Sequence, residues 1–100
     1  MTIDFAAMAN NVEHAEQLLK ILANKNRLMI LCSLQGREMS VSELNAAVPL
    51  AQSALSQHLA ALRKANIVST RRESQTIYYR VINDNAQAML ATLYGLFCKE

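Results

Sequence analysis

The fold of this chain is decided by residues 49–79, which read PLAQSALSQHLAALRKANIVSTRRESQTIYY. The first half of this stretch places Leu55, Leu59 and Leu62 at i, i+4 and i+7, the spacing of one face of a helix. The pattern predicts a helix over 52–65 with these leucines buried. The opposite face of that helix is left to short polar side chains.

The polar face of this helix carries side chains of the size that reads base edges in a DNA major groove. They are Ser53, Ser56, Gln57 and Lys64, with His58 near the edge of the face. An ordinary solvated helix face has the same composition, so this face alone is weak support for DNA binding. His58 also has a second interpretation, as a residue packed at the edge of the core.

A β-hairpin is predicted directly after the helix. Two runs rich in β-forming residues lie at 67–71 and 77–82, with Glu73-Ser74-Gln75 as the tip between them. Within residues 49–79 a single acid, Glu73, faces the basic residues Arg63, Lys64, Arg71 and Arg72. Arginines near a hairpin tip hold phosphates or enter a minor groove, so helix and hairpin together favour DNA binding.

Four further helices are predicted, at 12–23, 26–34, 42–48 and 85–98. Ser42 is the expected N-cap of the third helix and Asp84 that of the last. Residues 49–51 form a short turn between the helices at 42–48 and 52–65, which is the helix-turn-helix pattern. Gly36 is expected to end the helix at 26–34, and Asn66 to cap the helix at 52–65 in a left-handed conformation.

One hundred residues indicate a single small domain, with residues 1–10 as an arm that frays or packs on a partner. Hydrophobic residues make up 52% of the sequence, more than so small a domain easily buries. The helices at 12–23 and 85–98 have wide apolar faces, so we expect them to form a homodimer interface. Because the net charge is only +2, any nucleic-acid site must be a local patch.

Composition also excludes several classes of protein. Residues 1–10 have no basic region before an apolar core, so we expect no secretory leader there, and no apolar run approaches the roughly 20 residues that a membrane span needs. We therefore expect a cytoplasmic protein without a membrane partner. Enzyme chemistry is not expected, because no Ser-His-acid set, glycine-rich phosphate loop or paired carboxylates occur at usable spacing. A helical interaction module that never touches DNA is a remaining rival.

Two segments, LKILANKNRLMILCSL and AQSALSQHLAALRKANIVSTRRESQTIYYRV, resemble the ArsR/SmtB family of bacterial winged-helix repressors, and the likeness covers about residues 15–98. The resemblance implies a mainly α fold with a small β-hairpin, a winged helix-turn-helix that forms a homodimer through its first and last helices. It implies that the helix at 52–65 enters the major groove of double-stranded DNA at an inverted repeat. By resemblance, Gln52, Ser53, Ser56, Gln57 and His58 lie at the DNA-reading face, and Arg71, Arg72 and Gln75 lie in the wing.

Metal sensing is common in that family, but this sequence lacks the usual ligands. Residues 42–48 read SELNAAV, without a Cys-x-Cys pair, and the last helix has Asp84 but no histidine. Zinc and thiophilic metals prefer three or four nitrogen and sulfur ligands, so we expect neither a metal nor another cofactor. A metal-responsive repressor that shares thiols and an acid across the dimer is kept as an alternative.

Cys32 and Cys98 are the two cysteines of the chain. Taken singly, each has a plain interpretation as a small buried apolar residue. The motifs ILCSL and LYGLFCKE, however, resemble the cysteine pair of the thiol-responsive branch of the family, the branch of HlyU and BigR. That resemblance implies that an oxidant or a reactive sulfur species links Cys32 to Cys98 and releases DNA. Independently of the resemblance, Lys99 adjoins Cys98 and favours its thiolate, whereas the carboxyl end of a helix opposes it. The regulator is then a repressor, or an activator that displaces another repressor.

Overall fold

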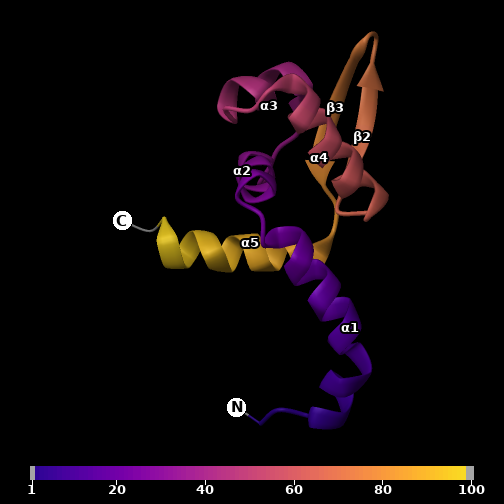
Figure 1. The fold of residues 1–100 in the computed structure, drawn as a ribbon, viewed down its shortest axis with the longest axis vertical. Coiled ribbons are helices and arrows are strands. Elements are labelled where there is room, and N and C mark those ends of the chain that lie inside the picture. Colours follow the sequence, from indigo (N-terminus) through magenta and orange to yellow (C-terminus); the bar gives the residue numbers. More distant parts are fainter. Residues whose placement is uncertain (1, 99–100) are drawn as a thin grey trace.

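The computed structural model describes residues 2–98, which form five helices and a three-stranded antiparallel sheet (Figure 1). In chain order the elements are α1 (Phe5–Leu22), α2 (Lys25–Ser33), β1 (Met39–Ser40), α3 (Val41–Ala47), α4 (Gln52–Lys64), β2 (Val68–Glu73), β3 (Thr76–Val81) and α5 (Asp84–Phe97). The predicted helical fold, with a hairpin between the fourth and last helices, is confirmed.

The core is built around the leucines of α4. Leu55, Leu59 and Leu62 are 0%, 1% and 0% exposed. Burying such a side chain stabilises a fold by about 1.5–3 kcal/mol relative to leaving it in water, so this stripe fixes the rotation of α4 about its axis. The other buried apolar residues are Leu22, Ile30, Leu31, Leu34, Met39, Leu44, Val48, Ile67, Val68, Val81, Ala86 and Leu90.

The sheet has the order β1-β3-β2, so the second hairpin strand lies at its centre. β2 and β3 pair from Val68 with Val81 to Glu73 with Thr76. Ser74 and Gln75 make the turn, and Ser74 has φ 58°, a left-handed value that tight hairpin turns require. The predicted strand limits and the three-residue tip were therefore wrong by one or two residues, because the pairing continues to Glu73.

Strand β1 was not predicted, because two residues are too few to show an alternating pattern. Ser40 pairs with Tyr78 in the sheet and is also the N-cap of α3. Its Oγ accepts a hydrogen bond from the Glu43 N–H at 3.2 Å, while the Glu43 carboxylate accepts one from the Ser40 N–H at 2.9 Å. This capping box needs its serine three residues before the acid, so the predicted cap at Ser42 is wrong.

The last helix also begins one residue earlier than predicted. Asn83, not Asp84, is the N-cap of α5, and its side-chain oxygen accepts a hydrogen bond from the Ala86 N–H at 2.9 Å. Asp84 is instead the first helical residue, where its negative charge favours the positive end of the helix dipole. Either side chain can cap a helix, so composition alone did not separate the two positions.

The first helix is longer than the predicted 12–23. The Asp4 side chain accepts a hydrogen bond from the Ala7 N–H at 3.1 Å and starts α1 at Phe5. Residues 5–10 are therefore helical, and the expectation that residues 1–10 fray or pack on a partner stays a prediction; Met1 lies outside the described residues. Figure 1 shows this end of α1 projecting away from the rest of the fold.

Of the two predicted helix ends, the one at Asn66 is confirmed and the one at Gly36 is wrong. Asn66 has φ 60° directly after the α4 C-cap, so its left-handed conformation is confirmed. Gly36 is also left-handed, at φ 74°, but α2 ends at Ser33. Gly36 thus serves the turn between α2 and β1 and does not itself end the helix.

Large apolar side chains are left uncovered on the first and last helices. Phe5, Met8, Val12 and Leu19 are exposed on α1, and Tyr94, Leu96 and Phe97 are exposed on α5. No helix within residues 2–98 is both long enough and apolar enough to cross a membrane.

Candidate nucleic-acid interface

The polar face of α4 is exposed, as its sequence predicted. Gln52, Ser53, Ser56 and Gln57 are all open to solvent, while the leucine stripe on the other side is buried. A helix held by a buried stripe presents its polar face in a fixed direction. Such a face can enter a major groove without rearrangement of the fold.

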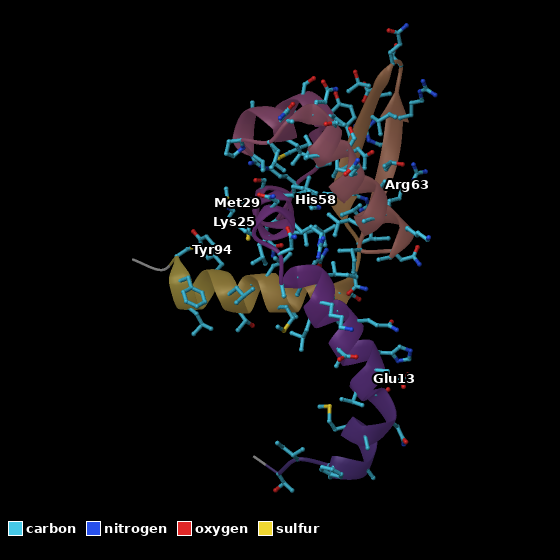
Figure 2. The ribbon with its side chains drawn as sticks, in the orientation of Figure 1. Glu13, Lys25, Met29, His58, Arg63 and Tyr94 are labelled. Carbon is cyan, nitrogen blue, oxygen red and sulfur yellow. The ribbon has the colours of Figure 1, made fainter. Side chains whose placement is uncertain are left out.

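His58 differs from the other candidates on α4. It is half-buried, whereas Ser56 and Gln57 are exposed. Figure 2 shows Arg63 on the hairpin side of α4 and His58 on the side away from the hairpin. The geometry therefore agrees better with the second interpretation of His58, a residue at the edge of the core.

A groove of about 540 Å³ separates α4 from the hairpin. Its lining residues are Val41, Ser56, Leu59, Ala60, Arg63, Lys64, Asn66 and Tyr79. The groove thus combines a short polar side chain with two cations, a donor set that suits phosphate oxygens. Asn66 and Tyr79 were not among the predicted site residues, because only the packing of the hairpin beside α4 brings them here.

The amino end of α4 lacks a side-chain cap. Ala51 occupies the N-cap position and makes no capping hydrogen bond. The first N–H groups of the helix are consequently available to an external acceptor, and the helix dipole favours a negative charge there. This feature was not predicted from the sequence, although Ala51 before Gln52 already indicated it, because an alanine side chain cannot cap a helix.

Arg71 and Arg72, the two arginines of the wing (the β2–β3 hairpin, residues 68–81), lie on opposite faces of the sheet. Side chains alternate along a strand, so Arg72 shares a face with Val68, which is buried against the core beside α4. Arg72 is exposed at the far end of that face, and its Nε donates to the Ser74 carbonyl at 3.2 Å. Arg71 points to the other face. Gln75 is exposed in the turn.

Arg71 is engaged by two carboxylates. Its Nε donates to Glu38 at 3.0 Å and its Nη1 donates to Glu73 at 2.7 Å, while the guanidinium lies 4.7 Å from the centre of the Tyr78 ring. The hydrogen bond from Arg71 lowers the pKa of the Glu38 carboxyl, and the hydrogen bonds to Glu38 and then Glu73 raise the pKa of Arg71. Glu38 and Arg71 are therefore both charged at neutral pH.

Both cysteines are exposed, so their interpretation as buried apolar residues is wrong. Cys32 lies near the end of α2, and Cys98 is the C-cap of α5, where its N–H donates to the Tyr94 carbonyl at 2.8 Å. Partial burial raises the pKa of the Cys32 thiol, and the charge of Cys98 raises it further. Lys99 lies outside the described residues.

In the described part of the chain, the histidines and cysteines do not gather with acids into a metal site. Within residues 2–98 no group of three or more His, Cys, Asp or Glu side chains is placed to hold one ion.

Comparison with known proteins places this arrangement in a family. Residues 24–70 match the family described as bacterial regulatory protein, arsR family. The chain is 47% identical over 92 residues to the transcriptional activator HlyU of Vibrio cholerae, an alignment that covers 92% of this chain and 85% of HlyU. This chain belongs to the ArsR family.

Solved ArsR-family structures share the whole fold. Reduced HlyU from Vibrio cholerae matches with a TM-score of 0.88 at 46% identity, covering 93% of this chain and 98% of that one. The crystal structure of the transcriptional repressor BigR from Xylella fastidiosa matches with a TM-score of 0.90 at 36% identity, covering 98% and 100%. The predicted winged-helix fold and the resemblance to the HlyU and BigR branch are confirmed.

The same relatives fix the class of activity. They are transcriptional regulators, so this ArsR-family chain is a DNA-binding regulator and not an enzyme. The rival interpretation, an interaction module that never touches DNA, is thereby set aside.

The two kinds of DNA contact predict different mutant behaviour. Gln57→Ala should weaken binding to a preferred duplex by about 1–3 kcal/mol and leave random-sequence binding almost unchanged, because a glutamine on the reading face acts through base edges. Arg72→Ala should weaken binding to both duplexes and reduce the salt slope by about 0.9 per lost phosphate contact. Fluorescence anisotropy at several salt concentrations measures both quantities. Equal losses on the two duplexes for Gln57→Ala would exclude base reading by that residue.

Proposed function

We propose that this protein is a homodimeric regulator that binds an inverted repeat and loses DNA affinity when Cys32 and Cys98 are oxidised or persulfidated. The observation that supports the switch most directly is the pair of exposed thiols, near the end of α2 and at the C-cap of α5, with Cys98 among the causes that raise the pKa of Cys32. The relatives named above include an activator and a repressor. We expect repression when the bound site overlaps a promoter, and we expect the protein to act in the cytoplasm, where bacterial DNA lies.

The dimer is proposed from the exposed apolar side chains of α1 and α5. Phe5 and Phe97 are 81% and 80% exposed, which is unusual for the largest apolar side chains of a small protein. Isologous pairing of these helices buries the same residues on both protomers. It also sets the separation of the two α4 helices, which must be about 34 Å to enter successive major grooves.

The thiol chemistry needs no metal or cofactor. A thiolate that attacks a polysulfide becomes a persulfide, and the polysulfide leaves as an anion one sulfur atom shorter. Attack by the second thiol on that persulfide gives a disulfide and releases hydrogen sulfide. Two persulfides instead condense to a trisulfide with loss of one hydrogen sulfide. Because its pKa is raised, Cys32 must lose a proton before it attacks in either step.

A covalent link between α2 and α5 acts directly on the proposed interface. Cys98 terminates a helix that carries dimer residues, whereas Cys32 sits on a helix of the protomer core. A bond between them restrains the angle at which α5 leaves the protomer. Since two half-sites must be engaged together, a small change in that angle weakens both DNA contacts. The resulting loss of DNA affinity on thiol linkage is the coupling free energy between the thiol site and the DNA site.

The decisive experiment treats the purified protein with sodium tetrasulfide and measures DNA affinity beside intact mass. Wild-type protein should lose at least about ten-fold in affinity, equivalent to about 1.4 kcal/mol of coupling, with a mass change that shows an internal sulfur link. Dithiothreitol should restore binding. Cys32→Ser and Cys98→Ser should each bind DNA normally and fail to respond. A response retained by the double serine variant would eliminate the switch, because the chain has two cysteines.

A further inference from the structure

The wing is three-stranded at its base and two-stranded towards its tip. β1 pairs with β3 only at Tyr79 and Tyr78. Beyond Tyr78 the hairpin continues as two strands alone, from the pair of Arg72 with Ile77 to the turn at Ser74 and Gln75. A two-stranded ribbon is marginally stable in water and twists easily, so its direction needs support at its base.

Arg71 lies at that base and reaches across the sheet. It stands opposite Tyr78 on the central strand, and its guanidinium lies over the Tyr78 ring. On the far side it meets Glu38, the residue before β1, through both Nε and Nη2 at 3.0 and 2.5 Å. The contact therefore links the outer strand of the wing to the edge of the protomer core.

Charge compensation leaves Arg71 poorly suited to bind phosphate. Two carboxylates, Glu38 and Glu73, contact its guanidinium, so Arg71 is already paired twice. Arg80 is a second cation near this cluster, where its charge helps to lower the pKa of Glu38. A phosphate would have to displace these partners and approach both acids. Arg72 contacts no carboxylate in the described chain and donates only to the Ser74 carbonyl, on the face shared with the core beside α4.

We propose that Arg71 is a positioning residue that Glu38 and Glu73 hold in place to fix the wing relative to α4, and that it makes no phosphate contact. Arg72 is then the wing arginine that meets DNA. The inference rests on the proposed DNA interface and refines it, since adjacent arginines receive opposite roles. Glu38, an acid, becomes a residue that supports DNA recognition.

The test compares Glu38→Gln, Arg71→Gln and the double variant, with Arg72→Gln as the matched control. The duplex is one that wild-type protein selects from a random library, beside a duplex of random sequence. The ratio of the two affinities removes general electrostatic effects, and the double variant keeps the net charge of the wild type. Glu38→Gln and Arg71→Gln should each lower this ratio by at least about two-fold. The double variant should lower it no further than Arg71→Gln, because the Glu38 contact is already absent from that variant.

The salt slope separates positioning from phosphate contact. It should stay unchanged in Arg71→Gln and fall by about 0.9 per protomer in Arg72→Gln. A similar fall in Arg71→Gln would overturn the proposal, because it shows a direct phosphate contact. A rise in random-sequence affinity and in slope for Glu38→Gln would overturn it too, because the acid would then only withhold Arg71 from DNA.

Hydrogen exchange of the free protein tests the same contact without DNA. Glu38→Gln should speed exchange of the paired wing amides between Arg72 and Ile77 by about three-fold, in line with an exposed ion pair, and leave amides of α4 unchanged. Unchanged wing exchange would contradict the proposal. A wild-type protein that selects no duplex would defeat the proposed function, while the exchange result would still decide whether Glu38 fixes the wing.

Discussion

Phe97→Glu is expected to convert the protein to a monomer and to lower its affinity for an inverted repeat by at least about 100-fold. Phe97 is 80% exposed near the end of α5. Covering such a side chain in a dimer contributes about 1.5–3 kcal/mol for each copy, and the glutamate adds the cost of burying a charge. A monomer engages one half-site at a time, so the gain from linking two half-sites is lost. Size-exclusion chromatography with light scattering and anisotropy titration measure the two effects.

Ile77→Glu provides a control for this experiment. Ile77 is 38% exposed on the wing, away from α1 and α5, so the same change of charge there should leave the mass of a dimer unchanged. If Phe97→Glu also elutes as a dimer, or if the wild-type protein is a monomer at micromolar concentration, α5 does not form the interface.

Leu55→Ala is expected to destabilise the fold by about 3 kcal/mol. Leu55 is fully buried on α4, and removal of a buried leucine loses transfer energy and leaves a cavity, with costs of about 2–5 kcal/mol. The midpoint of urea unfolding should fall while the slope m stays the same, at one fixed protein concentration because dimers unfold with concentration dependence. Ser56 and Gln57 follow Leu55, so a shift of α4 into the cavity also moves the reading face.

Ile77→Ala is the comparison for this stability change. That side chain is partly exposed at a wing position, so its truncation should cost less than about 1 kcal/mol. Equal losses for the two variants would mean that the leucine stripe of α4 does not anchor the helix.

The large elements could be predicted because their signals are periodic. Three leucines at helical spacing fixed both the existence and the rotation of α4, and alternation fixed the hairpin. The errors lie at helix ends, where a single capping side chain decides the first residue of the helix. Ser40 and Ser42 are both plausible caps, and the spacing from Ser40 to Glu43, a capping box already present in the sequence, selects Ser40. Asp4 gave no periodic signal at all, so the first turns of α1 were missed.

The different roles of the two wing arginines could not be predicted for a related reason. Arg71 and Arg72 are neighbours of the same type, and sequence alone gave both the same role. Their separation depends on the sheet register and on Glu38, which lies 33 positions away from Arg71. The exposure of Cys32 is similar, because a helix as apolar as α2 suggested a buried thiol and only the packing of its neighbours leaves it open.

The dual role of Ser40 has a consequence for the architecture of target sites. Because Ser40 closes the sheet through Tyr78 and starts α3 with its side chain, the wing and the helix-turn-helix share one rigid joint. Base pairs touched by α4 and those beneath the wing should therefore keep a constant offset within each half of an operator. Natural variation in length, and tolerance to inserted base pairs, should be concentrated at the centre between the halves.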